Sequence, residues 1–185
     1  MSQGLEDNPS QSMILVDSEG NPNGEILDRK TAHSTPGKKH LAIQVLVFNP
    51  NNELILHERP LKKVGGGVLD SPTTHVLNGE TPQQAANRCL KAEYGISDTD
   101  VKVLSGFSYE KDYKDGSCEN EYCLAAFMVS NSEISHNAEH SGKISNIKAS
   151  RVAQELESGS SKYPVWFKET VRIVIADSKG KEFFD

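Results

Sequence analysis

The chain has 185 residues and a formal net charge of −6. This length predicts a single domain with a substantial core. The negative charge argues against nucleic acid as the main partner, because binding a phosphate backbone needs a basic surface. An anionic small molecule would need metal ions or a few local cations. Three cysteines, the lack of a leader sequence and the lack of a long apolar run indicate a cytoplasmic protein with no membrane segment.

The first third of the chain predicts paired strands. Residues 1–11 are polar and are expected to form a flexible tail before a single domain of residues 12–185. Residues 13–27 predict a strand, a turn at residues 20–24 and a second strand. Residues 40–59 repeat this pattern around a turn at residues 49–52, which predicts a hairpin.

A helix is predicted after the glycine-rich loop at residues 65–67. Thr81 suits the N-cap, Pro82 suits the first helical position, and Gln84 completes a capping box. Gly95 suits the left-handed position that ends a helix. The rest of the chain predicts two strands joined by a turn at residues 114–116, and then two helices; these four elements span residues 101–109, 119–130, 149–157 and 165–176. The fold class is therefore α+β.

The predicted helix carries part of a known motif. The stretch RCLKAEYGI begins at Arg88, and seven residues separate Arg88 from Glu80. This spacing resembles the Nudix box, G-x5-E-x7-R-E-U-x-E-E-x-G-U, in which U is a bulky aliphatic residue. Three positions differ, because the opening glycine is Thr74 and two glutamates that normally bind metal are Cys89 and Ala92.

Glu93 is the carboxylate that remains near the end of this helix. It lies three and four residues after Leu90 and Cys89, so all three fall on one apolar stripe. A carboxylate on an inward face is costly unless it is paired or binds a metal. The simpler alternative is a glutamate that bends out to water at the helix end.

Two glutamates and three histidines form a second set of candidates. Glu119 and Glu121 lie two residues apart, so a strand places both on one face, where they repel each other unless a cation lies between them. His33, His40 and His75 stand at junctions between predicted elements. A solvated strand face and hydrogen-bonded histidines are the simpler interpretation of each residue alone. Together they offer three nitrogen and two oxygen ligands, which suit Mn, Fe or Zn.

The order of these residues resembles type I isopentenyl-diphosphate isomerase, a branch of the Nudix superfamily, over residues 13–170. The carrying segments are AHSTPGKKHLA, TTHV and ENE. The resemblance implies a Nudix fold, with mixed β-sheets flanked by helices in an α/β/α sandwich, and a small-molecule diphosphate substrate. It implies one transition-type divalent metal, Mn, Zn or Fe, and it implies that Glu93 helps to hold a Mg²⁺ that bridges to the diphosphate. The implied ligands of the first metal are His33, His40, His75, Glu119 and Glu121.

The same resemblance implies further residues in the pocket. Tyr109 lies ten residues before Glu119, where the family places an active-site tyrosine. Trp166, in YPVWFKE, corresponds to an aromatic ring that faces a developing carbocation through a cation–π contact. The implied diphosphate-binding residues are Arg59, Lys62 and Lys63. Core aromatic rings and solvated surface cations are the simpler alternatives.

Thr73 departs from the family pattern. The isomerase moves a double bond by adding a proton to one carbon and removing a proton from another. The resemblance implies a cysteine in one of these roles, at the position of Thr73, and assigns the other role to Glu121 with Tyr109. A thiol with a pKa of about 8.5 exchanges protons near neutrality, whereas an aliphatic hydroxyl does so poorly.

Three functions therefore compete. The first is an enzyme similar to isopentenyl-diphosphate isomerase. The second is a Nudix hydrolase of a nucleoside or isoprenoid diphosphate, which the loss of carboxylates at Cys89 and Ala92 disfavours. The third is a non-catalytic protein that binds metal or diphosphate. The sequence leaves the substrate, the native metal and the oligomeric state open.

Overall fold

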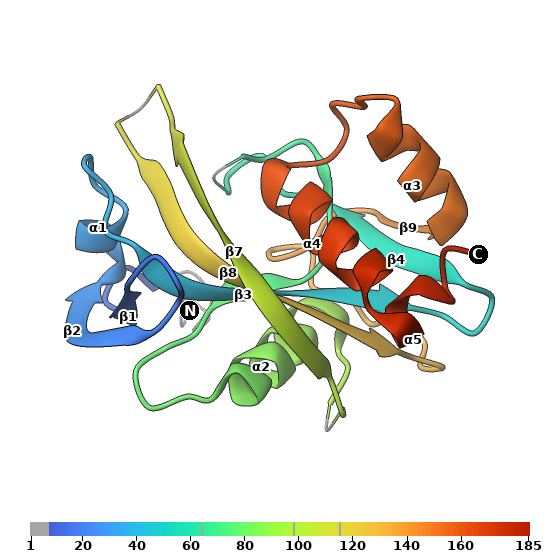
Figure 1. Ribbon diagram of the computed structural model, residues 1–185, viewed down its shortest axis with the longest axis horizontal. Coiled ribbons are helices and arrows are strands. Elements are labelled where there is room, and N and C mark those ends of the chain that lie inside the picture. The colour runs from blue at the N-terminus through green and yellow to red at the C-terminus, as the bar shows by residue number, and fades with distance from the viewer. Residues whose placement is uncertain (1–7, 64, 98, 115) are drawn as a thin grey trace.

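The computed structural model describes residues 8–63, 65–97, 99–114 and 116–185. The described residues form one sheet of nine strands with helices on both sides (Figure 1). The elements in chain order are β1 (Ser12–Val16), β2 (Pro22–Asp28), α1 (Arg29–Ala32), β3 (His40–Phe48), β4 (Glu53–Glu58), β5 (Leu69–Asp70), β6 (Thr73–His75), α2 (Pro82–Tyr94), β7 (Lys102–Asp112), β8 (Cys118–Val129), β9 (Ile144–Lys148), α3 (Ala149–Glu157), α4 (Val165–Ala176) and α5 (Ser178–Lys181).

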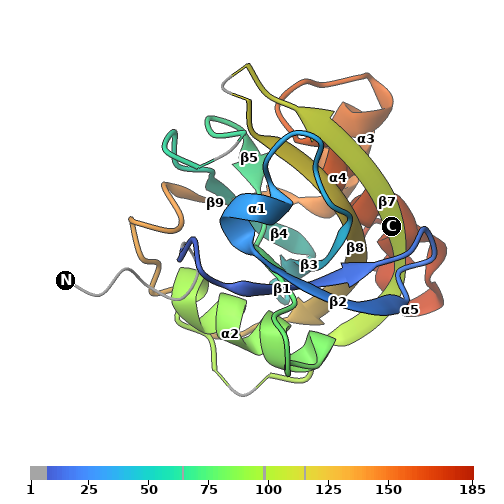
Figure 2. The same cartoon turned by 90° about the vertical axis from the view of Figure 1, so that its left-hand side faces the viewer.

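Strand β3 is the centre of the fold, and each of its nine residues is buried. Its alternation directs Leu41, Ile43, Val45 and Val47 into a core that includes the apolar face of α2. Leu46 and Phe48 belong to the opposite core, with residues of α3 and α4. Figure 2 shows α2 and the α3–α4 pair on opposite sides of the strands. The predicted α+β class and the layers of helix, mixed sheet and helix are confirmed.

The predicted hairpin at residues 40–59 is confirmed only at its turn. The register described for β3 and β4 consists of one pair, Phe48 with Leu54. Beyond it β3 pairs in parallel with β8 and antiparallel with β6, whereas β4 pairs with β5 and β9. A strand that is buried on both faces gains more from two long-range neighbours than from its neighbour in sequence, so the hairpin opens.

The helix signals are confirmed. Thr81 caps α2, its side chain accepts from Gln84 N, and the side chain of Gln84 closes the capping box. Gly95 ends the helix in the left-handed region with φ of 70°. Helices α3 and α4 span the predicted ranges, 149–157 and 165–176.

Several boundaries differ from the predictions. The first turn lies before Pro22 and not at residues 20–24, because β2 already begins at Pro22. The turn predicted at residues 114–116 includes residue 115, which lies outside the described residues. The predicted tail includes residues 1–7, which also lie outside the described residues, but Gln11 is buried and its carbonyl accepts from Arg29 N. None of the helices in the described part of the chain is long and apolar enough to span a membrane.

Candidate metal centre and active-site pocket

The register of four neighbouring strands brings the candidate side chains together. His40 on β3 lies opposite Glu121 on β8, and Glu121 lies opposite Tyr109 on β7. On the other side of β3, His75 of β6 pairs with Ala42. His33 follows α1, and its carbonyl accepts a hydrogen bond from Cys118 N, which ties it to the start of β8. Residues from positions 33 to 121 therefore converge at one place on the sheet.

The five predicted ligands form one compact cluster. One ligand atom from each residue lies within 4.8 Å of every other, and Glu119 and Glu121 lie on the same face of β8 as predicted. His33 Nε2 is 3.2 Å from Glu119 Oε2. The Nε2 atoms of His40 and His75 lie 3.4 Å and 3.2 Å from Glu121 Oε1. This group can hold a divalent metal ion with three nitrogens and two oxygens.

The surroundings of the histidines orient them for this purpose. His33 Nδ1 lies 2.8 Å from Arg29 O, and His40 Nδ1 lies 2.7 Å from Lys38 O. Because a carbonyl only accepts, each Nδ1 carries the proton and each Nε2 presents its lone pair to the cluster, as in many metal sites. Within the described residues the buried atoms His40 Nε2 and Glu119 Oε2 make no hydrogen bond. The cluster therefore fits a metal ion better than it fits a closed hydrogen-bond network.

The electrostatics of the cluster keep it ready for a cation. Burial lowers the pKa of His75 well below its usual value, although Glu121 opposes the shift. Burial alone would raise the pKa of Glu121, but its close contacts with His40 and His75 hold it well below its usual value. Neutral imidazoles and an ionised carboxylate are the forms that bind metal.

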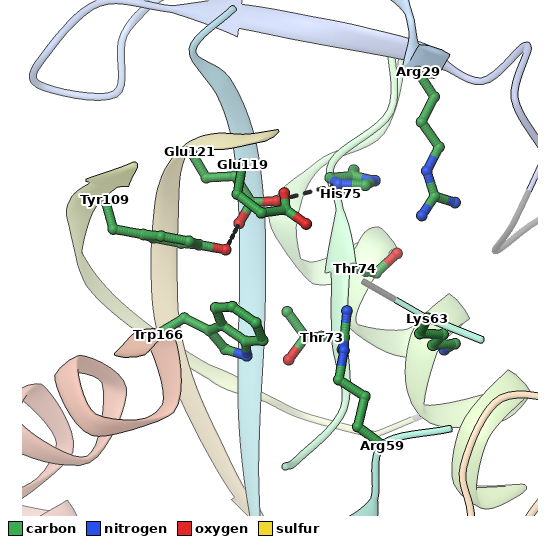
Figure 3. A pocket seen from close by; sticks show the side chains of 10 residues that line it. All are labelled: Arg29, Arg59, Lys63, Thr73, Thr74, His75, Tyr109, Glu119, Glu121 and Trp166. Carbon is green, nitrogen blue, oxygen red and sulfur yellow. Dashed lines mark hydrogen bonds and ion pairs between the residues drawn. The ribbon is translucent and has the colours of Figure 1, made fainter. Parts of the chain in front are cut away.

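Tyr109 and Trp166 extend the site beyond the cluster (Figure 3). Tyr109 Oη donates a 2.6 Å hydrogen bond to Glu121 Oε2, the oxygen that faces away from the histidines. Burial, together with the charge of Glu121, raises the pKa of Tyr109 well above its usual value, so the phenol keeps its proton. The Trp166 ring lies beside Tyr109, with centroids 5.6 Å apart, and both rings line the pocket.

The pocket next to the cluster is rich in cations (Figure 3). Arg59 and Lys63 line it, as predicted, and so does Arg29, which the sequence reasoning missed. Lys62 is exposed and is not among the lining residues, so the structure does not bring it to this pocket. The position of Arg29, four residues before His33 on the short helix α1, is the signal that would have found it. Three cations beside the five-residue cluster suit a phosphorylated ligand.

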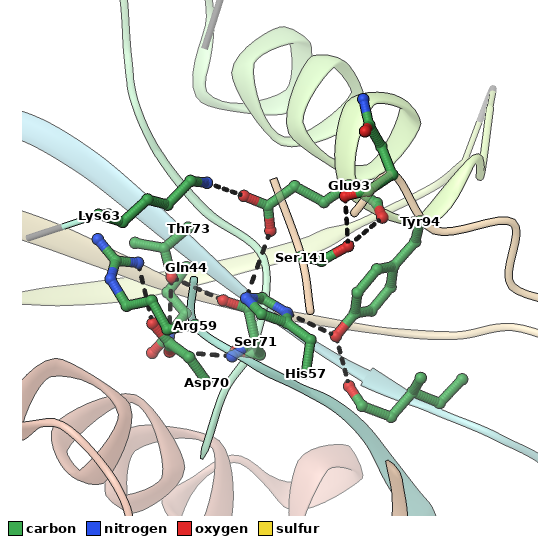
Figure 4. Close-up of polar contacts among 12 residues, drawn as sticks. Gln44, His57, Arg59, Lys63, Asp70, Ser71, Thr73, Glu93, Tyr94 and Ser141 are labelled. Carbon is green, nitrogen blue, oxygen red and sulfur yellow. Dashed lines mark hydrogen bonds and ion pairs between the residues drawn. The ribbon is translucent and has the colours of Figure 1, made fainter. Parts of the chain in front are cut away.

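Asp70 organises the base of the pocket (Figure 4). This fully buried carboxylate accepts from Trp166 Nε1 at 3.1 Å, from Arg59 Nη1 at 3.1 Å and from Gln44 Nε2 at 2.7 Å. It therefore fixes the indole and the guanidinium together. The sequence reasoning did not single out Asp70, because a lone aspartate in a two-residue strand carries no spacing signal.

Thr73 lies in the pocket, but its hydroxyl is already engaged (Figure 4). Thr73 Oγ1 donates to Ser71 O at 2.9 Å and accepts from Gln44 Nε2 at 2.9 Å. A hydroxyl has a single proton, and here that proton points at a backbone carbonyl. In this arrangement Thr73 does not present a proton to the pocket.

The remnants of the Nudix box have a structural role in α2 and the loop before it. Arg88 pairs with Glu80 through two nitrogens, at 2.7 Å and 2.9 Å. The same guanidinium donates to Thr74 Oγ1 and to His75 O. Arg88 therefore holds the strand that carries a metal-ligand candidate. Cys89 is buried, and neither Cys89 nor Ala92 has a carboxylate to offer the pocket.

Glu93 lies apart from the five-residue cluster. It is buried on the inward stripe of α2, as predicted, and its Oε1 lies 3.1 Å from Lys63 Nζ. His57, which the sequence reasoning set aside, faces the other oxygen, with Nε2 4.0 Å from Glu93 Oε2. Burial, with the charges of Lys63 and Arg59, lowers the pKa of His57 to about 3, so this imidazole is neutral.

Comparison with known proteins agrees with this architecture. Residues 38–167 match the NUDIX domain, and the chain belongs to the Nudix family. It is similar to proteins named isopentenyl-diphosphate Delta-isomerase. The protein from Citrobacter koseri is 34% identical over 61% of this chain and 64% of its own length. The one from Salmonella heidelberg is 32% identical over 70% of this chain and 72% of its own length. The resemblance to this branch of the family is therefore confirmed.

Solved structures show the same fold at lower identity. A Deinococcus radiodurans protein superposes with a TM-score of 0.67 at 15% identity, and covers 88% of this chain and 99% of its own. A MutT protein from Methanosarcina mazei superposes with a TM-score of 0.59 at 13% identity, and covers 78% of this chain and 92% of its own. The predicted Nudix fold is thus confirmed.

Proposed function

We propose that this chain is a divalent-metal-dependent enzyme that acts on a short isoprenoid diphosphate, as the relatives named isopentenyl-diphosphate Delta-isomerase do by their names. The observation that carries the proposal is the hydrogen bond from Tyr109 to Glu121, because it joins a proton-carrying group to a carboxylate of the five-residue cluster. A cluster kept for stability alone would not need a buried phenol directed into a polar pocket.

The residues of the pocket divide between two tasks. The five-residue cluster, His33, His40, His75, Glu119 and Glu121, would hold one ion of Mn, Zn or Fe. Arg29, Arg59 and Lys63 would bind the diphosphate, and a second divalent ion, with Mg²⁺ as the family expectation, would join Glu93 to it. A bound metal supplies positive charge that orients the substrate and stabilises its anionic end.

The proton chemistry would run between two sides of the pocket. Isomerisation adds one proton to the terminal carbon of a double bond, which leaves a carbocation at the branched carbon, and removes one proton from the carbon beyond it. Glu121 and Tyr109 would exchange a proton on one side. The Trp166 ring would face the carbocation, and Asp70 would hold that ring in place. On the other side stands Thr73, whose own proton is directed to Ser71 O.

A Nudix hydrolase of a nucleoside or isoprenoid diphosphate is the second candidate, and the hydrogen bonds of the Thr73 hydroxyl favour it. With the hydroxyl proton committed, the second proton-exchanging group that isomerisation needs is not supplied by this side chain. Hydrolysis needs only one base and an attacking water. Against it, the face of α2 carries Cys89 where a carboxylate would bind metal.

One assay separates these functions from a non-catalytic role. The full chain, supplied with Mn²⁺ and Mg²⁺, is incubated with isopentenyl diphosphate in D₂O. Nuclear magnetic resonance follows double-bond movement and deuterium uptake, and a colorimetric assay follows free phosphate. Deuterium uptake into carbon supports the isomerase-type function. Phosphate release without carbon exchange supports the hydrolase, and neither signal, with binding retained, supports a non-catalytic diphosphate-binding protein.

A further inference from the structure

A chain of hydrogen bonds fixes the tautomer of His57 (Figure 4). Tyr94 Oη donates to the backbone carbonyl of Ile55 at 2.9 Å. The phenol has one proton, so its oxygen can only accept from His57 Nδ1, which lies 3.1 Å away. His57 Nδ1 therefore carries a proton. In the neutral imidazole the lone pair must then be on Nε2.

That lone pair points at a carboxylate. His57 Nε2 lies 4.0 Å from Glu93 Oε2, and the two side chains are 1% and 2% exposed. Both atoms are acceptors, so they do not attract each other directly, and a cation between them would be held by both. Imidazole nitrogens and carboxylate oxygens bind divalent ions at about 2.0–2.2 Å, so two ligands of one ion lie up to about 4.3 Å apart. A separation of 4.0 Å is within this reach.

The backbone that carries the Glu93 side chain is itself fixed by several contacts. Ser141 Oγ donates to Glu93 O at 2.8 Å, and Asn137 N donates to the same carbonyl. The next carbonyl, of Tyr94, accepts from Ser135 N. The segment before β9 therefore clamps the end of α2. A side chain on a fixed backbone loses less conformational entropy when it binds an ion than one on a mobile backbone, which favours binding.

We propose that His57 Nε2 and Glu93 Oε2 together bind a divalent cation, so that the ion at Glu93 has one nitrogen and one oxygen ligand from the protein. The inference rests on the proposed function only in that this ion would serve the same pocket. Magnesium prefers oxygen ligands alone, whereas imidazole suits Mn, Fe, Co and Zn. His57 thus changes the preferred ion at Glu93 from Mg²⁺ to a transition-type metal.

Lys63 serves as a replaceable counter-ion in this arrangement. Its Nζ lies 3.1 Å from Glu93 Oε1, and its side chain also lines the pocket beside Arg59. When an ion binds Glu93, the ammonium is released toward the pocket, where an anionic ligand can take it. The ion and an anion in the pocket therefore bind cooperatively, because each removes Lys63 from competition with the other.

The test uses Mn²⁺ as the probe on the full chain after removal of metal by a chelator. Electron paramagnetic resonance measures free Mn²⁺ during a titration and so counts bound ions. The wild type is expected to bind two Mn²⁺ ions. In His57→Gln, excess Mg²⁺ should displace the ion at Glu93 more easily than it does in the wild type. In that variant the affinity of this second ion falls about tenfold or more. Pulsed spectra should lose one nitrogen coupling.

Matched variants make each outcome decisive. Glu157→Gln removes an exposed carboxylate on α3 and should leave both ions bound. Glu93→Gln removes the other ligand and tests the site even if His57→Gln does not fold. His75→Ala should weaken only the binding of the ion in the five-residue cluster. It therefore tests the metal site of the proposed function separately from the ion at Glu93. Equal Mn²⁺ binding by the wild type, His57→Gln and Glu93→Gln overturns the inference, because it would mean that His57 and Glu93 bind no metal.

Discussion

The two regions that surround the pocket use similar polar residues for different ends. On the sheet, His40, His75 and Glu121 point into one cluster that can hold a metal ion. On α2 and the loop before it, Arg88 pairs with Glu80 and also donates a hydrogen bond to the backbone carbonyl of His75. The helix of the Nudix box is thus mainly a support, and four of the five residues of the cluster lie on strands. The family motif survives where it holds the fold together.

This division of labour predicts the largest effect for a ligand on the sheet. His75→Ala removes one of five ligands from a preformed cluster, so the affinity for one Mn²⁺ should fall at least about 100-fold, or about 2.7 kcal/mol. Equilibrium dialysis with elemental analysis measures the loss. His136→Ala is the control. Retention of that ion at wild-type affinity would contradict the assignment of the cluster.

The supporting helix should respond in stability instead. Arg88→Met keeps the apolar length but breaks the pair with Glu80 and frees Thr74 and His75 O. The pair is only partly buried, so the expected loss is about 2–3 kcal/mol of unfolding free energy, below the roughly 3–5 kcal/mol of a fully buried pair. Urea unfolding measures it.

The contrast between the regions fails if Arg88→Met behaves like a ligand variant. Metal affinity, measured at a temperature where the variant is folded, should change less than in His75→Ala. A loss of metal binding as large as that of His75→Ala, with stability unchanged, would place Arg88 in the metal site.

The stability of the protein should depend on pH through His57, which faces the end of α2. The folded chain holds the pKa of His57 at about 3, below the unfolded value of about 6.5. Below pH 6.5 the unfolded chain therefore binds a proton that the folded chain refuses, and stability falls as the pH drops toward 3. Between pH 7 and pH 5 the metal-free protein should lose about 2 kcal/mol from this group. Unfolding curves of the wild type and His57→Gln at both values isolate it, and parallel pH dependence would refute it.

The smallest effect concerns Thr73. Thr73→Cys introduces a group that exchanges protons near neutrality and hydrogen-bonds Ser71 O only weakly. If the pocket retains isomerase geometry, isomerisation should rise at least about tenfold, which is about 1.4 kcal/mol of transition-state stabilisation. Thr73→Ser keeps the hydroxyl and is the control. Robust isomerisation by the unmodified chain would show that another group supplies the proton.

Local patterns were sufficient for several elements. Thr81, Gln84 and Gly95 determine the ends of α2, because caps act on backbone groups a few residues away. The alternation of Glu119 and Glu121 put both on one face for the same local reason. The resemblance to a family supplied the five-residue cluster, since no local spacing links His33 to Glu121.

By itself the sequence determined the three longer helices and the class of the fold, and its resemblance to a family supplied the set of candidate ligands. Only the tertiary structure decided which polar residues meet. The parallel pairing of β3 with β8 places His40 beside Glu121, and it opens the hairpin that the turn at residues 49–52 suggested. The facing of His57 and Glu93, and the convergence of Trp166 and Arg59 on Asp70, likewise join distant segments. Such contacts are set by burial and strand register across the whole sheet, and these leave no mark in the spacing of neighbouring residues.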